Sequence, residues 1–208
     1  MKFRVLVVIS LFAGVFAGCE SERKVATPEM DWVGTWSTAI QLVEPHNMPP
    51  EPGLSGNTLR QIVKVSAGGE VLRLRLSNRF GTEPVVISEV RFAQSAGGGR
   101  IISDTDTEVF FNGSPSLEIA PGEAIVSDPF DFLLQPLSEM AITIHVESIS
   151  EDITGHPGSR TTSYIASGNV VSETELADAV PAERWYIIDG LDVKVPESHG
   201  AISIIGNS

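Results

Sequence analysis

The chain ends in Gly206, Asn207 and Ser208, and a serine in this position could act as a nucleophile. They follow Ala201–Ile205, an apolar run typical of a buried strand. In open α/β sheets, active-site groups lie just beyond the carboxyl ends of parallel strands. A glycine at such a place lets a substrate approach the backbone closely, and a serine supplies a hydroxyl and a backbone N–H. The same tripeptide is also typical of a turn, so the pattern alone leaves both interpretations open.

Cys19 is the only cysteine, and its surroundings indicate lipidation. The apolar run Val5–Ala17 follows a short basic start and is shorter than the roughly 20 residues that cross a bilayer, which favours a secretory signal. The small residues before Cys19 resemble the bacterial lipobox, with Phe16 where leucine is usual. We therefore expect a lipoprotein signal peptide at residues 1–18 and acyl chains on Cys19. The alternative is an ordinary signal peptide and an unmodified, buried cysteine.

The polar segment 19–30 has no periodicity and is expected to be a tether. Acyl chains on Cys19 would hold the protein more firmly than one reversible lipid does. The sequence therefore predicts an extracytoplasmic protein of the bacterial cell envelope, attached to the membrane through a lipid anchor.

The composition excludes several classes of partner. With 14 Lys+Arg against 27 Asp+Glu among 208 residues, the net charge of −13 argues against a nucleic-acid partner. One cysteine excludes an internal disulfide framework and a cysteine-rich zinc site. The length suits one good-sized domain, or one domain plus a piece of another.

The alternating carboxylates Asp104, Asp106 and Glu108 could form a calcium site. Val109 occupies the loop position where an EF-hand requires glycine, so an acidic strand edge or loop fits better. We expect no metal and no cofactor.

The aromatic and histidine residues have ordinary explanations. Trp32, Trp36 and Trp185 could form a platform for stacking sugars, but packing in a core is the more common role. His156 lies in the turn-like segment Gly155–Gly158, and a structural role is expected there. The other histidines have no partner at ligand spacing; they are His46, His145 and His199.

The elements that must position these residues are expected to be strands. In the segment Val71–Ser77, leucines alternate with polar residues, which is the period of a half-buried strand. The segment Thr58–Val65 precedes it, and Gly68-Gly69 between the two predicts a tight hairpin. Further strands are expected at Val85–Phe92, Glu108–Phe111, Ser116–Ile119, Ala124–Val126, Ala141–Glu147 and Trp185–Ile188. One short helix is expected at Ser172–Ala179.

Short strands separated by glycine and proline favour an all-β domain, a β-sandwich or jelly roll, over residues 31–195. Residues 196–208 are then the start of a second domain. The motifs that support this division are Trp36–Ala39, Thr58–Val63, Val65–Gly69, Leu74–Asn78, Phe80-Gly81, Gly155–Gly158, Arg160–Tyr164, Trp185-Tyr186 and Gly190–Val193.

In this order, the motifs resemble the β-sandwich region that precedes the catalytic domain in a group of secreted SGNH/GDSL-type hydrolases, over roughly residues 31–208. The resemblance implies that the strand after the sandwich is the first of an α/β, flavodoxin-like hydrolase domain. It implies that Ser208 is the nucleophile and a backbone donor to the oxyanion, with Gly206 and Asn207 completing the motif. Asn207 stands where the family has aspartate.

The resemblance also implies a base and an orienting carboxylate from an Asp-x-x-His block. No Asp-x-x-His occurs in the 208 residues, and Asp152 and His156 have the wrong spacing. At Ser208 the chain also carries its terminal carboxylate, next to the place where negative charge must develop. We therefore expect the N-terminal part of an esterase, truncated at its nucleophile and inactive in this form. The family implies an acyl-ester substrate, such as acetyl groups on a polysaccharide.

A non-catalytic β-sandwich lipoprotein, with a carbohydrate-binding or scaffolding role, is the alternative. The apolar run Ala201–Ile205 argues against it, because a strand with no sheet to join exposes an aggregation-prone edge.

Overall fold

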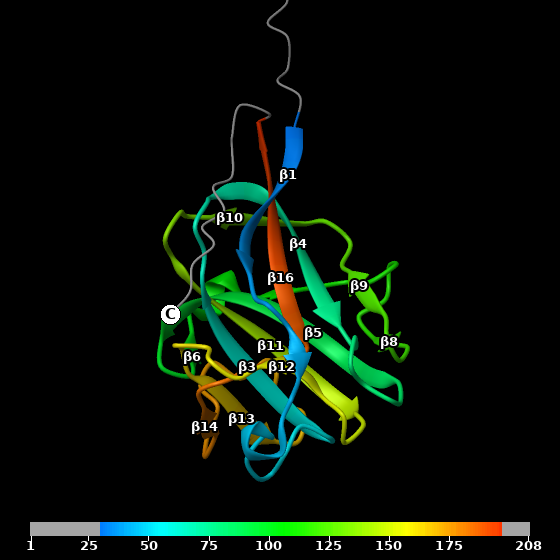
Figure 1. Cartoon of the computed structure of the whole chain (residues 1–208). Helices are drawn as coiled ribbons and strands as arrows, with labels where there is room; N and C mark the ends of the chain where they lie inside the picture. The colour runs from blue at the N-terminus through cyan, green and yellow to red at the C-terminus, as the bar shows by residue number, and fades with distance from the viewer. Residues whose placement is uncertain (1–29, 197–208) are drawn as a thin grey trace, which may run out of the picture.

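The computed structural model describes residues 30–196, and this part of the chain is all-β, as the sequence predicts (Figure 1). Within it, there is no helix long and apolar enough to cross a membrane. The strands are β1 (Met30–Ser37), β2 (Gln41–Leu42), β3 (Asn57–Lys64), β4 (Gly69–Ser77), β5 (Val85–Gly97), β6 (Arg100–Ile101), β7 (Thr107–Glu108), β8 (Leu117–Ile119), β9 (Ala124–Val126), β10 (Phe130–Leu134), β11 (Glu139–Ser148), β12 (Thr154–His156), β13 (Ser163–Ser167), β14 (Val180–Ala182), β15 (Trp185–Tyr186) and β16 (Ile188–Pro196). Two single 3-10 turns, η1 (Pro45–Asn47) and η2 (Ser103–Thr105), complete the elements.

The strands form two large antiparallel sheets and one small one. The first has five strands, in the order β1-β16-β4-β10 with β9 also paired to β4. The second has eight, in the order β14-β13-β3-β11-β5-β6 with β7 and β8 also paired to β5. A separate three-stranded sheet has the order β15-β12-β2 and carries Trp185 and His156, two members of the aromatic cluster described below.

The core forms where the two large sheets face each other, which is the arrangement of a β-sandwich. Leu72, Leu74 and Leu76 of β4 are fully buried, as their alternation predicts. In β11, the buried alternate residues are Met140, Ile142, Ile144 and Val146. Phe92 of β5 meets Phe130 and Phe132 of β10 edge-on, with ring centroids 5.4 and 4.8 Å apart, and these contacts join the two sheets.

Most predicted strands are confirmed, but two predicted elements are wrong, and the strand expected at Trp185–Ile188 is broken at Ile187 and divided between β15 and β16 of different sheets. The strand expected at Glu108–Phe111 ends at Glu108, and Phe111 instead forms an isolated bridge with Ser114. The segment 172–179 contains turns and no helix. Its carbonyl groups are taken by other partners: Arg60 binds those of Glu173 and Thr174, so they are not free for helical hydrogen bonds.

The predicted hairpin between β3 and β4 is also wrong, because these strands belong to different sheets. Neither Gly68 nor Gly69 has a positive φ. A side chain on Gly68 would bring a Cβ to 2.5 Å from the Leu134 carbonyl oxygen and 2.8 Å from Pro136 Cδ. The segment therefore crosses between sheets, and glycine is needed there for close approach rather than for a turn.

Thr35 of β1 holds this crossover in place. Its hydroxyl donates to the carbonyl of Ala67 (2.7 Å) and accepts from the Ala67 N–H (2.9 Å). Its carbonyl accepts from the N–H of Ser66 at 2.9 Å. The crossover is consequently tied to the edge strand of the five-stranded sheet.

We expect Gly68→Ala to lower the free energy of unfolding by about 1–3 kcal/mol, because the new methyl group meets backbone that other hydrogen bonds hold fixed. Urea denaturation of the 208-residue chain measures the loss. Gly158→Ala is the matched control, since its Cβ would meet only His156 Nε2, at 3.8 Å. Equal losses in the two variants would contradict the close-approach explanation.

Candidate functional site

The residues that the sequence singles out for catalysis and lipidation lie outside the described residues. These are Gly206, Asn207 and Ser208 at one end of the chain and Cys19 at the other. His199 also lies there. Their roles remain predictions, and the described geometry is that of the domain between them.

An aromatic cluster joins β1 to the three-stranded sheet. The ring of Trp36 meets that of Trp185 nearly at right angles, with centroids 4.9 Å apart. His156 of β12 stacks on Trp185 at 5.7 Å, and its Nδ1 lies 2.7 Å from the Ala39 carbonyl oxygen. Trp185 Nε1 donates to Thr161 Oγ1 at 3.0 Å. His156 therefore has the structural role expected of it, and it fixes the tryptophan ring.

Trp32 lies apart from this cluster, on the other side of β1. The guanidinium group of Arg73 lies 4.5 Å from its ring centroid, and Arg73 Nε also donates to Asp192 Oδ2 at 2.9 Å. Within residues 30–196, no ring contact joins Trp32 to the other two tryptophans. The three rings do not form one flat platform for a sugar.

Beside the aromatic cluster, a group of polar side chains bind one another. Arg184 Nε donates to Asn47 Oδ1 at 2.9 Å, and Asn47 Nδ2 donates to Glu44 Oε2 at 2.9 Å. The bond from Asn47 is the main cause of a lowered pKa at Glu44. Tyr186 donates to the Asn47 carbonyl at 3.0 Å, and burial raises the pKa of Tyr186 to about 12. This network holds η1 against β15, and its groups are occupied with each other.

The most buried charge of the described residues is Arg60, on the outer face of the eight-stranded sheet. Its side chain is 0% exposed, and Nε donates to Thr143 Oγ1 at 2.9 Å. The remaining donors bind the carbonyls of Gly99 (2.7 Å), Val171 (3.3 Å), Glu173 (2.7 Å) and Thr174 (3.4 Å). Burial lowers the pKa of Arg60 to about 10, so the group stays charged at neutral pH. Arg60 thus fastens the segment 168–176 and the β5–β6 turn onto the sheet.

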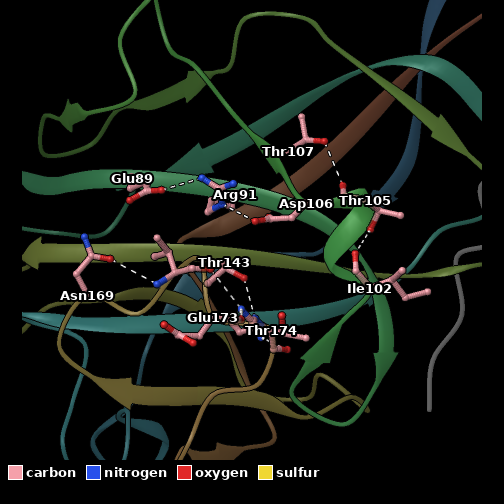
Figure 2. Close-up of polar contacts among 12 residues, drawn as sticks. Glu89, Arg91, Ile102, Thr105, Asp106, Thr107, Thr143, Asn169, Glu173 and Thr174 are labelled. Carbon is pink, nitrogen blue, oxygen red and sulfur yellow. Dashed lines mark hydrogen bonds and ion pairs between the residues drawn. The ribbon is translucent and has the colours of Figure 1, made fainter.

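Arg91 extends this polar layer, and Figure 2 shows it between two carboxylates. Its Nε donates to Asp106 Oδ2 at 2.8 Å, and its Nη1 to Glu89 Oε1 at 3.0 Å. Asp106 is one of the three carboxylates considered for calcium. Across residues 30–196 there is no group of three or more histidine, cysteine, aspartate or glutamate side chains that could hold a metal ion. Asp106 holds a loop against β5 instead.

One further pair, Ser88 and His145, is not predictable from the sequence. Ser88 Oγ lies 2.6 Å from His145 Nδ1, across the β5–β11 ladder. A histidine that acts as the base for a serine has its second ring nitrogen bound to an orienting carboxylate. In the described part of the chain, His145 Nε2 has no such bond. The two residues were missed because they lie far apart in the sequence, and only strand pairing brings them together.

These observations define an all-β, sandwich-type domain whose polar clusters serve to position loops. Within residues 30–196, no serine, histidine and carboxylate are joined in the chain of hydrogen bonds that a triad requires. Comparison of the sequence with protein-family models and with curated proteins finds no match.

Proposed function

We propose that the chain is the N-terminal part of a secreted, lipid-anchored serine ester hydrolase of the SGNH/GDSL type. The observation that carries the proposal is the order of the motifs. Those of the sandwich region fall within one all-β domain, and β16 ends at Pro196, before the apolar run Ala201–Ile205 and the Gly206-Asn207-Ser208 motif. The described domain acts as the support on which an α/β catalytic domain begins.

The reaction is acyl transfer through a serine ester. The Ser208 hydroxyl attacks the carbonyl carbon of the substrate, a histidine takes its proton, and the alcohol leaves with that proton. Water then hydrolyses the acyl-enzyme by the reverse sequence of proton transfers. The Ser208 N–H is one donor to the oxyanion. The histidine, its carboxylate and the other oxyanion donors have no counterparts at matching spacing in the 208 residues, so the proposal requires them from further sequence.

The substrate class proposed is an acyl ester, with acetylated polysaccharide the favoured example. The chain acts outside the cytoplasm, at the bacterial cell envelope, where Cys19 holds it to the membrane. Its net charge of −13 disfavours a strongly anionic substrate at long range, and salt screens this effect beyond about 10 Å.

The second candidate is a carbohydrate-binding or scaffolding lipoprotein without catalysis. Three half-buried tryptophans in an all-β domain favour it. The rings of Trp36 and Trp185 are engaged with each other and with His156, which leaves the esterase as the better-supported proposal.

One experiment separates the two candidates. The gene is read past codon 208, and the extended protein is assayed with p-nitrophenyl acetate beside the 208-residue chain. The esterase proposal expects an open frame with an Asp-x-x-His block and turnover by the extended protein alone. A stop codon at this point, together with polysaccharide binding by the 208-residue chain, would establish the binding protein instead.

A further inference from the structure

The two most exposed large apolar side chains of the described residues lie close together. Leu133, at the end of β10, and Leu137, in the following turn, are each 69% exposed, whereas the other exposed large apolar residues range from 38% to 45%. We call this part of the molecule the leucine end, defined by Leu133, the turn Gln135–Ser138 and Met30.

Leu137 is held in a conformation that its side chain does not favour. The Ser138 hydroxyl donates to the Gln135 carbonyl at 2.6 Å and closes the turn, with Pro136 second and Leu137 third. Leu137 has φ 63°, and at this place such turns ordinarily carry glycine or asparagine. A branched apolar residue with positive φ is uncommon and costs stability. Because the Leu137 side chain is mostly exposed, its burial does not offset the cost of the positive φ.

The leucine end is also the end at which the N-terminal segment joins the fold. Met30 pairs with Pro196, and Leu134 pairs with Gly69, on strands that follow the order β1-β16-β4-β10. Three strand spacings place Met30 and Leu134 about 15 Å apart across the sheet. Met30 itself is 42% exposed, and it lines a hollow of about 300 Å³ with Gly68–Val71 and Lys194–Pro196.

We propose that the leucine end is a membrane-contact surface, on which Leu133 and Leu137 enter the interface of a zwitterionic phospholipid bilayer. The proposal rests on the lipid anchor proposed for Cys19. Ten residues separate Cys19 from Met30, and such a segment spans at most about 40 Å. An anchor on Cys19 therefore keeps Met30, and the end of the molecule around it, within about 40 Å of the bilayer. Zwitterionic lipid is the partner because a net charge of −13 is repelled by an anionic surface.

The test supplies the anchor chemically. Because Cys19 is the only cysteine, the chain from Cys19 to Ser208 is coupled there to a single myristoyl-length maleimide. One such chain gives only marginal, reversible binding, so added leucine contacts are measurable. Binding to phosphatidylcholine–phosphatidylethanolamine vesicles is measured by sedimentation. We expect Leu133→Ser and Leu137→Gly each to weaken binding about fivefold or more.

The matched control is Val126→Ser in β9, which is 44% exposed and lies away from this end; we expect less than a twofold change. Weaker binding by Leu137→Gly cannot be explained by unfolding, because glycine suits the positive φ. The melting temperature of this variant should be no lower than that of the parent. Vesicle binding that is equal in the parent and both leucine variants overturns the inference. So does a concentration-dependent dimer that both leucine substitutions abolish, since a second copy then covers the leucines.

These outcomes do not depend on whether cells acylate Cys19. The mass of the protein made in bacteria with its own leader tests acylation separately. An unmodified Cys19 would remove the anchor from the proposed function, while the vesicle measurement would still report on the leucines.

Discussion

Arg60→Ala is expected to lower the free energy of unfolding by about 4 kcal/mol. The substitution removes the side-chain donor of the Gly99, Val171 and Glu173 carbonyls and of the Thr143 hydroxyl, in a place where Arg60 was 0% exposed. The Thr174 carbonyl keeps the N–H of Ile101. Each buried polar group that loses its partner costs about 1–3 kcal/mol, and entry of water offsets part of the sum. For a domain of this size the loss corresponds to a melting temperature lower by about 8–16 °C.

Two further variants define the cause of this loss. Arg60→Lys keeps the positive charge but not the planar fork of five donors, so we expect it to recover only part of the stability. Arg79→Ala is the control, because Arg79 is exposed and its side chain makes no hydrogen bond or ion pair within the described residues. Calorimetry gives the melting temperatures. A loss at Arg60 no larger than that at Arg79 would show that the buried guanidinium does not fasten the loop.

Hydrogen exchange locates the effect. If Arg60 fastens the segment 168–176, Arg60→Ala raises exchange in that segment and in the β5–β6 turn before it affects β4 or β16. A uniform rise over the whole domain would indicate global destabilisation alone.

In the protein extended past residue 208, Ser208→Ala is expected to lower turnover of p-nitrophenyl acetate by about a thousandfold or more. The hydroxyl that forms the acyl-enzyme is then missing, and only binding and oxyanion stabilisation remain. The loss should appear in kcat, since alanine retains the backbone N–H and leaves the binding of substrate largely unchanged.

Ser203→Ala is the matched control for this experiment, because Ser203 lies in the same apolar run and has no role in the proposed chemistry. We expect it to keep most of the activity. Comparable activity in Ser208→Ala and the parent would exclude Ser208 as the nucleophile. Asn207→Asp, which restores the family's usual residue, should retain activity.

The strands of the core were predictable because their pattern is local. Leu72, Leu74 and Leu76 alternate with polar residues, and this alternation survives folding since one face of β4 is buried. Gly68 and Gly69 also stand out in the sequence, but the contact that explains Gly68 comes from Leu134, on a strand distant in the chain. Two adjacent glycines indicate a turn and a close approach equally well.

The polar layer could not be predicted from the sequence. Arg60 occupies an outward position in β3, where a charged residue normally faces water. It is buried because the segment 168–176 folds over it. The local sequence around Arg60 and that of the segment do not predict this contact. The predicted helix failed for the same reason, since its carbonyl groups are bound by a side chain from β3.

For the candidate site, the sequence offers motifs but no geometry. The roles of Ser208 and Cys19 are predicted from residue types and order and stay predictions, because both lie outside the described residues. The pair of Ser88 and His145 arises from strand pairing alone. Leu137 is similar: a leucine after a proline gives no signal of a positive φ, which follows from the hydrogen bonds that close the turn.

The pairing of β1 with β16 has a consequence for how the protein is made. The first strand of the described fold hydrogen-bonds to the last, from Met30 with Pro196 to Ser37 with Gly190, and β1 lies at the edge of its sheet. Because the N-terminal end of the chain is synthesised first, β1 has no partner strand until nearly the whole domain has been made. Its two tryptophans, Trp32 and Trp36, lack their folded-state contacts for that interval, and an unpaired apolar strand of this kind is prone to aggregation.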